Sequence, residues 1–66
     1  MKTYHVYTKT DTVLEVKAEG VGHCDELIYF LTVPIEEYIK SETRERYVKA
    51  IFNCDAIIGF QEVTND

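Results

Sequence analysis

The sequence predicts a mainly β protein that folds as a small antiparallel sheet, and three observations lead to this prediction. Val, Ile, Thr, Tyr and Phe make up 28 of the 66 residues, whereas Ala and Leu contribute only three each. Such β-branched and aromatic side chains fit a pleated, half-buried surface and lose rotamer freedom on a helix. Several short stretches also alternate polar and apolar residues, and turn-forming residues separate these stretches.

The length of the chain limits it to one hydrophobic core. Chains of about this size bury only about 60% of the surface that their unfolded form exposes. The chain therefore has too few residues to build a second hydrophobic core. The apolar fraction of 45% and the mean hydropathy of -0.21 are typical of a folded chain. We therefore expect residues 1–66 to form a single domain, with only residues 64–66 free to fray.

The first two strands are expected over residues 4–9 and 12–18, where polar and apolar side chains alternate with a period of two. Thr10 and Asp11 separate them, and short polar side chains of this kind can hydrogen-bond their own backbone in a tight turn. The pattern predicts an opening hairpin whose second strand ends near Glu19.

Residues 19–23 are predicted to form a turn or a bulge, because they include Gly20 and Gly22 and glycine tolerates positive φ. The continuous apolar run over residues 27–33 follows. It is too short for a typical helix and ends at Pro34, which cannot continue one. This run is the predicted third strand, covered on both faces.

A short helix of one or two turns is expected after Pro34, because Ile35, Tyr38 and Ile39 recur at helical spacing. It cannot continue as one amphipathic helix to residue 52. At about 100° per residue, the apolar residues beyond 46 face the opposite side from Ile35 and its neighbours. The all-polar stretch 41–45 therefore separates two elements.

Residues 46–52 fit two patterns, and the choice between them decides the fold class. As a strand, they place Val48, Ala50 and Phe52 on one face. As part of a helix near residues 43–53, they form an apolar stripe, which would make the protein α+β. Composition favours the strand. Turn-forming residues at 53–55 then precede the last strand, 57–63, in which Gly59 marks a bend or a close approach.

Five short strands follow from these assignments, with one possible helix between the third and fourth. A single small five-stranded antiparallel sheet, or an SH3-like open barrel, would bury one apolar face and limit the number of bare edges. The comparison with SH3-like barrels concerns architecture alone and carries no function.

The charge and the ends of the sequence restrict the function classes. Twelve acidic residues oppose seven basic ones, giving a net charge of -5, which argues against a general binder of nucleic-acid backbones. The alternating start is unlike a signal peptide, and no run approaches the roughly 20 apolar residues of a membrane span. We expect a cytoplasmic protein without membrane contact, in which Cys24 and Cys54 remain thiols.

No motif for metal, cofactor or catalysis is recognisable, so we expect no cofactor, no metal and no enzymatic activity. The combination of His5, His23, Cys24 and Cys54 is a poor zinc site, because the adjacent His23 and Cys24 would point to opposite faces of a strand. The same geometry argues against a nucleophilic pair. Gly20 and Gly22 lack the third glycine and the following helix of a phosphate-binding loop.

The predicted function is that of a small acidic, non-enzymatic protein-binding module of the adaptor or inhibitor type. Tyrosine is enriched at interfaces, and an acidic segment could face a basic partner. The predicted contact residues are Tyr29, Glu36, Glu37, Tyr38 and Glu42. A core this small also favours self-association, with a dimer as the first choice. The competing explanation is that the acids only keep the domain soluble.

A second function is a small ligand- or nucleic-acid-binding β-roll that uses the first hairpin. Its aromatic and basic residues would be Tyr4, Tyr7, Lys9 and Lys17. The net charge makes a nucleic-acid ligand the less favoured choice. The two functions differ in what must cluster: tyrosines and acids on one face for the first, bases and exposed rings around a groove for the second.

Overall fold

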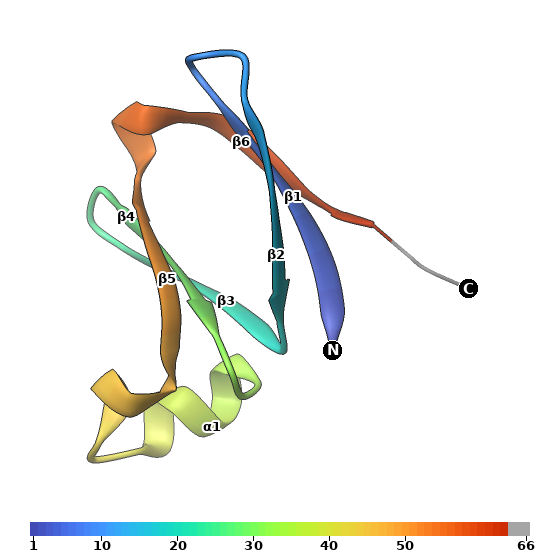
Figure 1. Cartoon of the computed structure of the whole chain (residues 1–66). Coiled ribbons are helices and arrows are strands. Elements are labelled where there is room, and N and C mark those ends of the chain that lie inside the picture. The colour runs from blue at the N-terminus through green and yellow to red at the C-terminus, as the bar shows by residue number, and fades with distance from the viewer. Residues whose placement is uncertain (64–66) are drawn as a thin grey trace.

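The computed structural model describes residues 1–63 and confirms a mainly β fold (Figure 1). Six strands form two three-stranded antiparallel sheets, with strand order β2-β1-β6 in the first sheet and β3-β4-β5 in the second. No helix in the described part of the chain is long and apolar enough to cross a membrane. The elements in chain order are β1 (Lys2–Thr8), β2 (Val13–Ala18), β3 (Gly20–Cys24), β4 (Leu27–Leu31), α1 (Ile35–Lys40), the 3-10 turn η1 (Arg44–Tyr47), β5 (Val48–Asn53), the 3-10 turn η2 (Cys54–Ala56) and β6 (Ile57–Val63).

The predicted opening hairpin is confirmed as β1 and β2, which pair from Lys2 opposite Ala18 to Tyr7 opposite Val13. Its turn is held by Thr8, whose backbone N–H and hydroxyl both donate to the carbonyl of Thr12, each at 2.9 Å. Asp11 adopts a φ of 62° in this turn. A short polar side chain tolerates that left-handed conformation better than most, which explains why no glycine is needed here.

The predicted turn at residues 19–23 is wrong beyond Glu19, where the chain bends, because Gly20–Cys24 forms strand β3. Neither of its glycines has a positive φ, so the conformational freedom of glycine is not what this segment uses. Only Glu19 separates β2 from β3, and its N–H donates to the carbonyl of Leu31 at 2.8 Å. The chain therefore passes from one sheet into the other without a loop, and the single five-stranded sheet is wrong.

Strand β4 is confirmed at the centre of the second sheet, although it ends at Leu31 and is shorter than predicted. The β3–β4 turn lies at Asp25, which has a φ of 54°. The prediction that both faces of β4 are covered holds only in part. Ile28 and Phe30 are buried on the face toward the first sheet, and Leu31 is buried on the other, but Tyr29 is only half-buried.

The structure also decides between the strand and the helix at residues 43–53. The helix is limited to the single 3-10 turn η1, and Val48–Asn53 is strand β5. Along β5 half-buried and exposed residues alternate, and Ala50 and Phe52 pack against the core. Pairing with the apolar strand β4 favours the extended conformation here, because it buries one face of β5 and satisfies its backbone. The predicted short helix before it is confirmed as α1.

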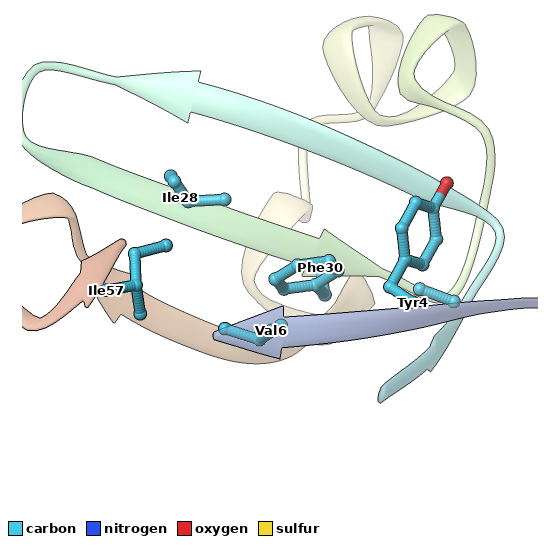
Figure 2. Close-up of a cluster of buried hydrophobic side chains, with 6 residues drawn as sticks. Tyr4, Val6, Ile28, Phe30 and Ile57 are labelled. Atoms are coloured by element: carbon cyan, nitrogen blue, oxygen red, sulfur yellow. The ribbon is translucent and has the colours of Figure 1, made fainter. Parts of the chain in front are cut away.

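The two sheets enclose one core, and Phe30 lies at its centre (Figure 2). The ring of Phe30 makes edge-to-face contacts with Tyr4, Phe52 and Phe60, at centroid distances of 5.4, 5.7 and 5.5 Å. Such pairs add to the burial of apolar area. Residues 64–66, which are predicted to fray, lie outside the described residues. The buried cluster consists of Tyr4, Val6, Ala18, Ile28, Phe30 and Ile57.

Candidate functional site

The candidate site lies on the outer face of the second sheet, beside α1, and the glycines of β3 make room for it. A side chain at Gly20 would place its Cβ only 2.7 Å from the carbonyl oxygen of Val33 and 2.9 Å from the amide nitrogen of Ile35. At Gly22 a Cβ would approach the Cδ1 atom of Ile35 to 3.0 Å. The two glycines thus allow the segment leading into α1 to lie directly on β3.

This placement of α1 brings two tyrosines together. Tyr29 comes from β4 and Tyr38 from α1, and their ring centres lie 6.5 Å apart with an angle of 31° between the ring planes. Both side chains are half-buried. Two aromatic rings from neighbouring elements of the chain therefore meet on one face, where each remains accessible to another molecule.

Arg44 joins this pair from the far end of α1. Its guanidinium carbon lies 5.9 Å from the centre of the Tyr38 ring, a distance typical of a cation–π contact. The same side chain donates hydrogen bonds to the carbonyl oxygens of Ile39, at 2.8 Å, and Ser41, at 3.3 Å. Carbonyl groups at the end of a helix have no intrahelical partner, so Arg44 both stabilises the end of α1 and fixes its own position against Tyr38.

Between α1 and β3 lies a groove with a volume of about 410 Å³, which we call the tyrosine groove. Next to it, Ile51 of β5 faces Tyr29 across the sheet and is 53% exposed, and Ile39 on α1 is 58% exposed. The surface is therefore mainly apolar and aromatic. The residues that line the groove are Val21, Gly22, His23, Cys24, Tyr29, Ile35, Tyr38, Ile39 and Arg44.

The environment of the groove raises the pKa of Tyr29 above the ordinary tyrosine value. Desolvation by burial is the largest cause, followed by the unfavourable charge interaction of a phenolate with Cys24 and then with Tyr38. The Tyr29 phenol, like an unperturbed tyrosine, is neutral at physiological pH. A neutral hydroxyl can donate as well as accept a hydrogen bond, which suits contact with a peptide backbone.

Only two of the five predicted contact residues meet. Tyr29 and Tyr38 line the groove, as described above. Glu36 and Glu37 lie in the first turn of α1 and are exposed, on the sides of the helix away from Tyr38. Glu42 lies past the end of α1, along a second depression of about 450 Å³ formed by residues 42–46, which shares Arg44 with the groove. None of the three acids lines the tyrosine groove itself.

Seven residues that line the groove were not among the predicted contact residues: Val21, Gly22, His23, Cys24, Ile35, Ile39 and Arg44. The exposed Ile51, which pairs with Tyr29 beside the groove, was not predicted either. In the sequence the glycines suggested a turn, and the spacing of Ile35 and Ile39 indicated only a short helix. Arg44 lies in a polar stretch whose approach to Tyr38 depends on how the chain folds back after α1. Ile51 follows the strand pattern, but its exposure depends on what covers the sheet.

The histidine and cysteine residues do not form a recognisable chemical centre. Cys24 pairs with Leu27 and His23 with Ile28, so the two neighbours lie on opposite faces of β3, as predicted. Both cysteines are free thiols, and the Cys24 thiol donates weakly to the Asp25 carboxylate at 4.0 Å. Among residues 1–63, no three His, Cys, Asp or Glu side chains are placed to hold a metal ion.

Comparison with known proteins gives this arrangement no family: no family model, no curated protein and no solved structure matches the chain.

Proposed function

We propose that this protein is a small non-enzymatic protein-binding module that takes a short segment of a partner protein into the tyrosine groove. The observation that carries the proposal is the meeting of Tyr29 and Tyr38 on a largely uncovered apolar face. A tyrosine ring buries a large area at low entropic cost while its hydroxyl stays satisfied, which is why tyrosine is enriched at interfaces.

The exposed apolar side chains beside the groove support the same function. Ile39 and Ile51 are each more than half exposed, and both border the tyrosine pair. A contiguous apolar surface with a polar rim is typical of a protein contact site, whereas single exposed apolar residues are ordinary. The groove combines such a surface with a concave shape that can accept a short segment of a partner chain.

The partner is proposed to be basic, because the protein carries a net charge of -5. We assign the predicted acids a different role, because they lie outside the groove: Glu36, Glu37 and Glu42. These acids would attract a basic partner over several ångströms and increase its association rate. They would contribute less to the lifetime of the complex, which depends on the apolar contacts in the groove.

The alternative, a ligand- or nucleic-acid-binding β-roll, is less well supported. Tyr4, one of its two rings, is only 6% exposed and packs against Phe30 inside the core. Tyr7 and Lys17 remain on the outer face of the first sheet, but Tyr7 is half-buried. Because Tyr4 is buried, only one of the two proposed rings remains to stack on bases, which weakens the case for a nucleic-acid-binding surface on the first hairpin.

The finer architecture and the assembly are proposals too. We propose an SH3-like open barrel, supported by the way in which β2 and β3 run through Glu19 as one bent strand shared by both sheets. We also propose a cytoplasmic protein that self-associates as a dimer through a free sheet edge. Sedimentation at several protein concentrations measures that association directly.

A selection of peptides from a displayed library of random twelve-residue sequences tests the proposed function. We expect enriched peptides to lose at least tenfold in affinity when Tyr38→Ala is introduced. Tyr47→Ala is a matched control, because Tyr47 is also half-buried and also has an arginine, Arg46, 5.9 Å from its ring centre, but does not line the groove. Equal losses for both variants, or no enriched peptide at all, would contradict the proposal.

A further inference from the structure

Building on the proposed function, we infer that the partner segment binds as an extended strand added to the free edge of β3, with an apolar centre and basic residues at both ends. This inference specifies the occupant of the tyrosine groove. In this binding mode backbone hydrogen bonds supply affinity, and alternate side chains enter the adjoining pocket and supply specificity.

The backbone of strand β3 borders the tyrosine groove. It pairs with β4 on one side only, because it is an edge strand of the second sheet. Four consecutive residues, 21–24, line the groove. Neighbouring side chains of a strand point to opposite faces, so a run of consecutive lining residues means that the strand edge itself borders the groove.

Among the edge strands within residues 1–63, β3 alone lacks both a formal charge and an irregularity. Natural proteins protect sheet edges with charged residues, prolines or bulges. Strand β2 carries Glu15 and Lys17, β5 carries Lys49 at a register shift, and β6 carries Glu62 and a register shift. Strand β3, with the sequence GVGHC, pairs with β4 in an unbroken register.

The charges at the two ends of β3 define the partner segment. Glu19, whose carboxylate also lies 3.9 Å from the N-terminal ammonium, precedes the strand, and the exposed Asp25 and Glu26 follow it directly. The five residues between them span roughly 17 Å in an extended strand. Basic side chains about five or six residues apart in the partner would face both acidic ends. Its centre would meet Tyr29 and Tyr38, and Arg44 in the groove wall would repel a cation there.

The experiment uses the peptides selected on the full-length protein. Replacing single backbone N–H groups of such a peptide by N-methyl groups should lower affinity about tenfold at alternate positions and leave the others almost unchanged. Amide hydrogen exchange should slow within Gly20–Cys24 on binding, whereas exchange within Ile57–Val63, an equally open edge, should not change.

A double substitution that removes two negative charges tests whether basic residues of the partner contact the acids that follow β3. Asp25→Asn combined with Glu26→Gln should weaken a selected peptide about threefold and reduce the salt dependence of its binding. Glu36→Gln with Glu37→Gln is the control, because these acids lie outside the groove and should reduce affinity less. The asparagine retains tolerance of the positive φ at residue 25, so the turn is preserved.

The possible outcomes separate this inference from the function on which it rests. Peptides that depend on Tyr38, and that are insensitive to N-methylation or do not slow exchange in β3, would overturn strand addition and leave groove binding intact. Peptides enriched in acidic residues would overturn the assignment of the ends. A selection that yields no peptide dependent on Tyr38 would overturn both.

Discussion

The two sheets of this protein have the same number of strands but present different outer faces. On the first sheet the outward rows are of both kinds, polar and apolar: His5 lies between Glu15 and Gln61, and Tyr7 lies between Val13 and Gly59. On the second sheet the connection between β4 and β5 folds back onto β3 and leaves Tyr29 beside Tyr38. By contrast, β5 and β6 are joined only by the short turn η2.

This difference shows that the connection from β4 to β5, rather than the sheets, makes the candidate site. Both sheets use alternating strands to build the core, and this alone produces no groove. The groove requires a helix on one face, a glycine-bearing strand on which the helix can rest, and an arginine that holds the end of the helix. Four groups of substitutions test this contrast.

The largest expected effect is a difference in stability between substitutions on the two faces of the second sheet. Phe30→Ala removes the fully buried ring between the sheets and should lower the free energy of unfolding by about 4 kcal/mol, most of the stability of a domain this small. Ile51→Ala, on the exposed outer face, should change it by less than about 0.5 kcal/mol. Urea denaturation followed by circular dichroism measures both. Similar losses would mean that the outer face is buried in solution.

The next effect concerns the glycines. Gly20→Ala should cost about 3 kcal/mol, because its Cβ would collide with backbone atoms of Val33 and Ile35, which cannot move without displacing α1. Gly22→Ala should cost less, because it meets only the end of the Ile35 side chain. Gly59→Ala in the first sheet meets nothing within 4 Å and should be tolerated. The order of the three urea midpoints is the measurement, and a neutral Gly20→Ala would contradict the contact.

A smaller effect is expected at the two stacked arginines. Arg44→Ala should lower the free energy of unfolding by about 1 kcal/mol, since it removes two hydrogen bonds to carbonyl groups as well as the contact with Tyr38. Arg46→Ala removes only a stacking contact, that with Tyr47, and should have a smaller effect. Thermal unfolding of both variants gives the comparison. Arg44→Lys should recover little, because an ammonium lacks the planar fork of the guanidinium.

The smallest effect is a pH dependence carried by Tyr29. Because its pKa is raised in the folded protein, the contribution of Tyr29 to stability is fully present below the ordinary tyrosine pKa of about 10 and is lost as the pH rises above it. Tyr29→Phe removes the ionisable hydroxyl and should flatten this part of the profile. The measurement is the difference between the urea midpoints of the two proteins at several alkaline pH values. A constant difference would contradict the raised pKa.

Much of the fold could be predicted from the sequence, because its signals are local. Alternation of side chains predicted the first hairpin and β5, the turn-forming residues 53–55 preceded the predicted β6, and Pro34 placed the start of α1. The main error, at Gly20 and Gly22, arose because glycine has two uses that a sequence does not distinguish. It can adopt positive φ in a turn, or it can admit a close neighbour in a strand, and here the neighbour is the segment before α1.

The candidate site was predicted less well than the fold, since it depends on which segments meet. The sequence indicated Tyr29 and Tyr38 as separate aromatic residues near acids, without any sign that their rings would lie 6.5 Å apart. It also grouped them with Glu36, Glu37 and Glu42, which are near in sequence. The rotation of α1 places those acids elsewhere, because successive helical residues point about 100° apart.

By itself, the sequence determined the mainly β class, the positions of most strands and the short helix, because side-chain shape and periodicity act on the backbone over a few residues. The tertiary structure alone decided that the strands divide into two sheets, that β3 is an edge strand and that Tyr29, Tyr38 and Arg44 share a groove. The division into two sheets depends on contacts between segments far apart in the chain, which meet in the core around Phe30. The groove depends on how the segment after β4 folds back onto β3, which no local side-chain pattern encodes.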